Sequence, residues 1–144
     1  MTEKSPGSGQ SQEQDLETLR YLQQLYEGQY ATISEGMNRS IQYMSELTQA
    51  QRTLDKIEIV RSKESLMHVG AGVYLSAKTN NAEKVTVNIG SGYMIEESVE
   101  DAKSFIASRL EKATAEFNRL AGSRKEIDNV LSDISRRIDA LIYR

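Results

Sequence analysis

The sequence predicts an α+β protein in which two long helices form an antiparallel coiled coil and a small β insert of two hairpins lies at the turn between them. Three observations lead to this prediction. Apolar residues repeat with heptad spacing in the first part of the chain and again in the last part. Between these two stretches, apolar and polar residues alternate with the period of two that is typical of half-buried strands.

The β insert is expected at residues 63–97, with strands at about 64–69, 73–78, 84–89 and 93–97 and a loop at 79–83 between the hairpins. Four strands this short cannot enclose a core, and their unpaired edges favour pairing with another chain. We therefore expect the insert to close its sheet against partner subunits. The residues expected to be buried at this subunit interface are Val73, Leu75, Val85, Val87, Ile89, Tyr93 and Ile95.

A glycine motif occurs twice in the insert, in Val69–Tyr74 and again in Ile89–Tyr93. Glycine permits positive φ, so each motif is expected to turn or bend its hairpin at Gly70, Gly72, Gly90 and Gly92. A glycine loop can also bind phosphate, but a dinucleotide site needs a third glycine and a helix that begins at once. The apolar alternation continues after both motifs, which excludes this class of site.

The first helix is expected at residues 12–62, after an N-terminal tail (1–11) that is predicted to be disordered because its run at 5–11 has no apolar residue to bury. Its seam is Leu16, Leu19, Gln23, Tyr26, Tyr30, Ile33, Met37, Ser40, Met44, Leu47, Gln51 and Leu54. The second helix is expected at 98–144, with Ser98 as its N-cap and an acid three residues later. Its seam is Ile106, Leu110, Ala113, Phe117, Leu120, Arg124, Ile127, Leu131, Ile134, Ile138 and Leu141.

If the chain folds back at the insert, facing residues have numbers that add to about 159, and the start of the first helix meets the end of the second. Both ends hold more apolar residues than a two-position seam can bury. These residues are Leu16, Leu19, Leu22, Leu25, Ile138, Leu141, Ile142 and Tyr143. Two interpretations remain: a locally wider seam or fraying end, or an exposed apolar patch that binds another molecule.

Composition excludes several classes of function. The formal net charge is −3, so the basic surface of a nucleic-acid binder is not expected. The chain has no cysteine and one histidine, His68, so we expect no disulfide, no metal site, no cofactor and no catalytic residue. No apolar run is long enough to span a membrane and the N-terminus does not look like a signal peptide, so a cytoplasmic protein is expected.

The two long helices and the doubled glycine motif resemble the alpha-class subunit of prefoldin, in its archaeal form, over residues 12–144. The resemblance implies a hexamer of two alpha and four beta subunits, in which the hairpins build a β-barrel platform. It also implies that the helix tips hold unfolded client proteins and transfer them to a group II chaperonin without using ATP.

Two hypotheses for the function follow. The first is an ATP-independent chaperone subunit, a holdase, that captures unfolded proteins at its apolar helix tips. The second is a structural coiled-coil adaptor that binds one folded partner. Binding of several unrelated denatured proteins would favour the first, and a single native partner would favour the second.

Overall fold

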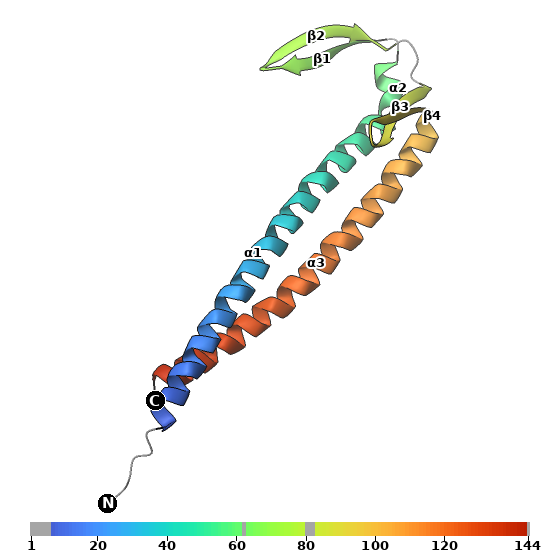
Figure 1. Ribbon diagram of the computed structural model, residues 1–144. Helices are drawn as coiled ribbons and strands as arrows, with labels where there is room; N and C mark the ends of the chain where they lie inside the picture. Colours follow the sequence, from blue (N-terminus) through green and yellow to red (C-terminus); the bar gives the residue numbers. More distant parts are fainter. Residues whose placement is uncertain (1–6, 62, 80–82, 144) are drawn as a thin grey trace, which may run out of the picture. The chain divides into compact units, whose positions relative to one another are not determined.

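The computed structural model describes residues 7–61, 63–79 and 83–143 of the chain (Figure 1). In chain order the elements are α1 (Gly7–Asp55), α2 (Ile57–Val60), β1 (Glu64–Gly70), β2 (Val73–Lys78), β3 (Lys84–Gly90), β4 (Tyr93–Ser98) and α3 (Val99–Ile142). The chain divides into two compact units. Unit 1 combines α1 up to Ile41 with α3 from Glu116, and unit 2 comprises Gln42–Ala115. The predicted α+β class is confirmed.

In unit 1 the two helices pack through the predicted heptad seams. Every seam position in this unit is buried or half-buried, and Met37, Ile134 and Ile138 are the most deeply buried. Arg124 is the polar member of the α3 seam. Its guanidinium lies 5.6 Å from the centre of the Tyr30 ring and donates a hydrogen bond of 3.4 Å to the Ser34 hydroxyl. The aromatic face and the hydroxyl thus accommodate a cation in an otherwise apolar seam.

In unit 2 a small core forms where the helices meet the β insert. Leu54 of α1 packs with Val99 and Ala102 of α3, and four partly buried residues surround this cluster: Ile57, Val85, Val87 and Ile106. The predicted N-cap of α3 is confirmed, because the Asp101 N–H donates to the Ser98 hydroxyl over 3.1 Å. The cap places Val99 and Ala102 in the first turn of α3, where they meet Leu54.

The antiparallel register is close to the predicted one. In unit 2, Lys103 forms an ion pair of 3.6 Å with Asp55, and in unit 1 Arg124 bonds to Ser34. The residue numbers in each pair add to 158 (103 with 55, 124 with 34), against an expected sum of about 159. The seam pattern therefore determined the pairing of the helices to within one turn.

Two helix boundaries differ from the prediction. Helix α1 already begins at Gly7, within the tail predicted to be disordered, while residues 1–6 lie outside the described part of the chain. Extending an existing helix gains one hydrogen bond for each residue fixed, so residues 10–14, which include good helix formers, continue it. At the other end α1 stops at Asp55, and the backbone of Lys56 leaves the helical region with φ of −105° and ψ of 13°.

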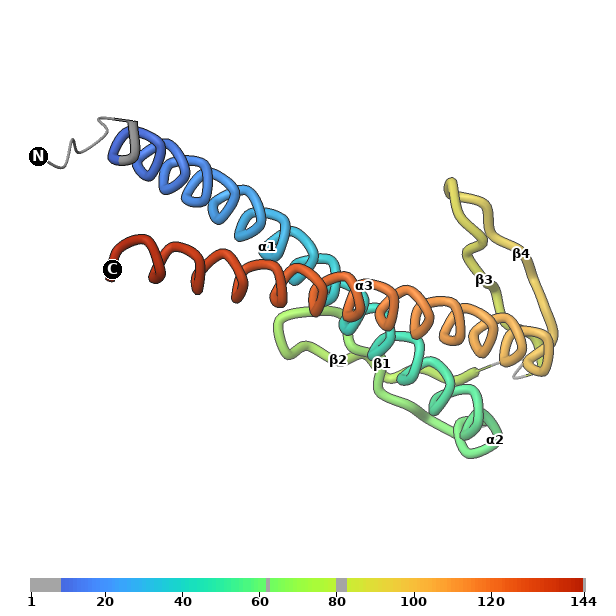
Figure 2. Tube along the Cα trace, turned by 90° about the horizontal axis from the view of Figure 1, so that it is seen from below, coloured from blue at the N-terminus to red at the C-terminus, as the bar shows by residue number. Residues whose placement is uncertain are grey.

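The four strands form two separate antiparallel hairpins, β1–β2 and β3–β4, each a two-stranded sheet (Figure 2). Their bounds agree with the prediction to within one residue. The described residues contain no closed barrel. Most of the loop predicted at 79–83 lies outside the described residues.

Candidate functional site

The glycine motifs make the tight turns that were predicted. Ala71 and Gly72 stand between the paired residues Gly70 and Val73, with φ of 50° and 77°. Positive φ at both central positions is what a type I′ turn requires, and its twist suits a two-residue hairpin. The second hairpin repeats this geometry, with φ of 53° at Ser91 and 80° at Gly92. Gly70 and Gly90 also have positive φ, at the register shift that precedes each turn.

Hairpin β1–β2 has apolar side chains exposed on both faces. Met67 pairs with Leu75, and Val73 lies on the same face by alternation. Each of these three residues is more than half exposed. The opposite face carries Leu66, which is 71% exposed, and Tyr74, whose ring lies 5.1 Å from that of His68. The predicted interface residues Val73 and Leu75 are therefore available for a contact with another chain.

Hairpin β3–β4 directs two of the predicted interface residues toward the core of its own chain, which corrects that part of the prediction. Val85 and Val87 pack against the Leu54 cluster of this same chain, although burial between subunits alone was expected. The reason is local: β4 runs directly into α3, and the Val99 N–H donates to the Glu83 carbonyl over 3.1 Å, which ties the start of β3 to the start of α3. The other predicted interface residues of this hairpin are exposed: Ile89, Tyr93 and Ile95.

Two polar atoms near this hairpin were missed by sequence reasoning. The Oε2 atom of Glu97 and the Nε atom of Arg61 are buried and have no hydrogen-bond partner among the described residues. Glu97 pairs with Val85 across the hairpin, on the face that packs against the core. The alternation from Tyr93 through Ile95 could have placed Glu97 on this face, since every second residue of a strand shares a side.

At the helix ends, the structure separates the predicted binding residues into three groups. Ile138 is buried, with 8% exposure, so it belongs to the seam and not to an exposed patch. Half-burial is found at Leu16, Leu19, Leu22 and Leu141. The exposed residues are Leu25 at 45%, Ile142 at 48% and Tyr143 at 83%. A helix-end surface thus remains apolar after the seam has formed.

Three of the half-buried leucines, Leu19, Leu22 and Leu141, border a groove of about 520 Å³ in unit 1. Helix α1 contributes Asp15, Thr18, Leu19 and Leu22, and α3 contributes Arg137, Ala140 and Leu141. Sequence reasoning identified the leucines but not Asp15, Thr18, Arg137 or Ala140. Asp15, Thr18 and Arg137 each lie four residues from a leucine of the set, a spacing that places residues on one helix face and could have identified them. Ala140 is adjacent to Leu141, so this spacing does not identify it.

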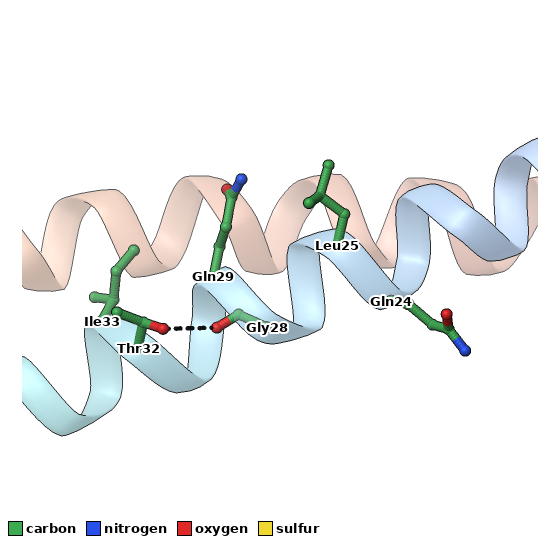
Figure 3. Close-up of a pocket in the computed structure, with 6 residues that line it drawn as sticks. All are labelled: Gln24, Leu25, Gly28, Gln29, Thr32 and Ile33. Carbon is green, nitrogen blue, oxygen red and sulfur yellow. Dashed lines mark hydrogen bonds between the residues drawn. The ribbon is translucent and has the colours of Figure 1, made fainter.

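A second concavity, of about 640 Å³, lies along α1 itself (Figure 3). Its lining residues are Gln24, Leu25, Gly28, Gln29, Thr32 and Ile33, none of which is charged. The absence of a side chain at Gly28 opens the space, and the Thr32 hydroxyl is already satisfied by the Gly28 carbonyl at 3.0 Å. Leu25 and Ile33 project from the same side of the helix (Figure 3).

Among the described residues, one pair of charged groups has shifted pKa values. The pKa of Glu116 is lowered by a hydrogen bond and the positive charge of Arg119, and the same contact raises the pKa of Arg119. Both residues lie on an exposed face of α3, three residues apart, which is an ordinary helix-surface pair. In the described part of the chain no three acidic, histidine or cysteine side chains come together as metal ligands.

The helices that the structure describes include none with the length and apolarity needed to cross a membrane. The exposed hairpin β1–β2 and the groove at the helix ends both present apolar side chains at the surface. Both are suited to binding other polypeptides.

Comparison with known proteins agrees with this interpretation. A family model described as "Prefoldin subunit" matches residues 26–142. The chain is 28% identical over 131 residues to "Prefoldin subunit alpha" of Methanoculleus marisnigri, which covers 91% of this chain and 88% of that protein. It is 24% identical over 125 residues to the protein of the same name from Pyrococcus horikoshii, covering 85% of this chain and 84% of that one.

The fold is also found among solved structures. The cryo-EM structure of filamentous PFD from Methanocaldococcus jannaschii superposes with a TM-score of 0.57 at 21% identity, covering 83% of this chain and 94% of that chain. This similarity concerns the fold alone. With the family model matching most of the chain, the conclusion is that this protein belongs to the prefoldin family of chaperone subunits and is similar to the alpha subunits of archaea.

Proposed function

We propose that this chain is an alpha-class subunit of a cytoplasmic prefoldin hexamer with two alpha and four beta subunits. The complex acts as an ATP-independent holdase that keeps unfolded proteins from aggregating and passes them to a group II chaperonin. The observation that carries the proposal is the apolar surface left at the helix ends, where Leu25, Ile142 and Tyr143 stay exposed beside a leucine-lined groove.

The energetics favour capture that is reversible. Burial of about 100 Å² of apolar client surface at one helix end contributes roughly 2.5 kcal/mol, before the cost of ordering the client. Such a contact is weak alone. Several helix ends that hold one client act together, because each further contact is intramolecular and has a high effective concentration.

Hairpin β1–β2 is the proposed site of subunit assembly. It exposes apolar side chains and has open strand edges on both sides, which are features that favour pairing with strands of another chain. Ile89, Tyr93 and Ile95 of the second hairpin are exposed and are proposed as further interface residues. The contribution of Val85 and Val87 is indirect, since they hold β3–β4 against the core of the chain.

The proposal is tested with the complex formed from this chain and a beta-class prefoldin subunit. We expect it to suppress aggregation of several unrelated chemically denatured proteins in the absence of nucleotide, and to ignore their native forms. A strict requirement for ATP would contradict the holdase function. Stoichiometric binding of one native protein, with no effect on denatured ones, would instead support the structural adaptor.

A further inference from the structure

Four of the seven residues that line the groove at the helix ends are apolar. Leu19, Leu22 and Leu141 are half-buried, so part of each side chain remains open to a bound segment. Ala140 adds a methyl group. The Thr18 hydroxyl donates to the Gln14 carbonyl over 2.9 Å, so it does not need a partner in the groove. An unfolded segment could therefore place aliphatic side chains here without leaving a buried polar group unpaired.

The two charged residues that line the groove are in different situations. The Nε atom of Arg137 lies 3.0 Å from the Asp133 carboxylate, so Arg137 has an ion-pair partner on α3. Arg136 lies 3.8 Å from the same carboxylate and does not line the groove. Asp15 is exposed, and within the described residues no lysine or arginine lies within 4.0 Å of it. Among the described residues that line the groove, Asp15 is therefore the charged residue without an ion-pair partner.

We infer that the groove selects unfolded segments in which an apolar run lies next to a lysine or arginine, and that Asp15 provides this selectivity. The inference rests on the holdase function proposed above. The apolar run occupies the space between the leucines, and the neighbouring cation reaches the Asp15 carboxylate at the rim. An acidic neighbour in the client would instead be repelled.

The expected selectivity is modest, because exposed ion pairs contribute about 0.2–1 kcal/mol. This free energy corresponds to about a 1.4- to 5-fold difference in Kd. The pairing should also weaken as salt is added, since exposed charges are screened. The leucines supply most of the affinity in this scheme, and Asp15 sets the preference among apolar segments.

Glu13 offers a matched control for Asp15. It stands two residues earlier on α1, which places it about 200° around the helix, and it does not line the groove. Both residues are exposed acids. Asp15→Asn and Glu13→Gln therefore remove the same charge from the same helix, but only the first removes it from the groove.

The test uses the assembled complex and three fluorescent unfolded peptides with the same leucine-rich run, flanked by two lysines, two glutamines or two glutamates. Kd is measured by fluorescence anisotropy at low and high salt. We expect the lysine peptide to bind about two- to five-fold more tightly than the glutamine peptide, and the glutamate peptide to bind more weakly. Asp15→Asn should reduce these differences, and Glu13→Gln should leave them close to the parental values.

The outcomes separate this inference from the proposed function. Equal binding of the three peptides by the parent complex would overturn the selectivity while supporting capture. Equal losses of selectivity in the two variants would assign it to the overall charge of the helix, and so overturn the role of Asp15. If the glutamine peptide and the other two all fail to bind, the capture function itself is contradicted.

Discussion

At the scale of single residues, the hairpin turns combine a necessary glycine with a strained neighbour. Gly72 has φ of 77° and Ala71 has φ of 50°, a region that costs an L-residue with a Cβ roughly 1–2 kcal/mol. We predict that Gly72→Ala destabilises hairpin β1–β2 by about 1–2 kcal/mol. A Cβ at Gly72 would have no atom within 4 Å, so the cost comes from the backbone alone. The destabilisation should be measurable as faster hydrogen exchange of the β1 and β2 amides in the assembled complex.

Ala71→Gly is the complementary change, because it removes the strained Cβ and keeps the turn. In the Ala71→Gly variant, the β1 and β2 amides should exchange as slowly as in the parent protein, or more slowly. If Gly72→Ala has no effect on exchange, the positive φ at that position is not required by the turn.

At the scale of the helices, neighbouring apolar residues at the end of α3 have different roles. Ile138 is 8% exposed in the seam, and Ile142, one turn later, is 48% exposed. We predict that Ile138→Ser lowers the free energy of unfolding by about 2–3 kcal/mol, as expected for loss of a buried aliphatic side chain. Ile142→Ser should change it by no more than about 0.5 kcal/mol and should weaken client capture.

Thermal unfolding followed by circular dichroism, together with an aggregation assay, separates these two effects. The Ile142 variant should melt with the parent and hold less denatured client. If it holds clients that depend on the alpha subunit as well as the parent does, the capture surface lies elsewhere on the helices. If the Ile138→Ser variant is as stable as the parent, the seam is open at this position in the parent protein.

At the scale of the whole molecule, assembly depends on which face of a strand is used. Leu75 and Ser76 are adjacent, exposed and on opposite faces of β2. We predict that Leu75→Asp prevents assembly with a beta-class subunit, since an unpaired carboxylate would be buried at the contact. Ser76→Asp introduces the same charge on the other face and should still assemble. Native mass spectrometry of the mixtures distinguishes the two results.

The isolated Leu75→Asp chain should keep its helical content, because Leu75 takes no part in the chain's own core. Val87→Asp is a less selective test. Val87 packs against the Leu54 cluster, so this change should also lower the stability of the chain itself. Normal assembly of the Leu75 variant would exclude that face of β1–β2 from the interface.

The sequence alone determined the helices, the hairpins and most of their bounds. Heptad spacing from Leu16 to Leu54 marks α1, and the Ser98 cap marks the start of α3, because these signals arise from residues near one another in the chain. The paired glycine motifs likewise defined both turns, since positive φ is a local requirement. The family could be recognised from these same local features.

Only the tertiary structure decided which apolar residues remain available for binding. Val85 and Val87 look like Val73 and Leu75 in sequence, but the tie between β3 and α3 turns the first pair onto the chain's own core. Ile138 and Ile142 are equally apolar, and the packing of α1 against α3 buries one and exposes the other. Asp15 lines a groove for the same reason, because the groove forms only where α1 lies beside α3. Which helix faces meet depends on residues that are distant in sequence.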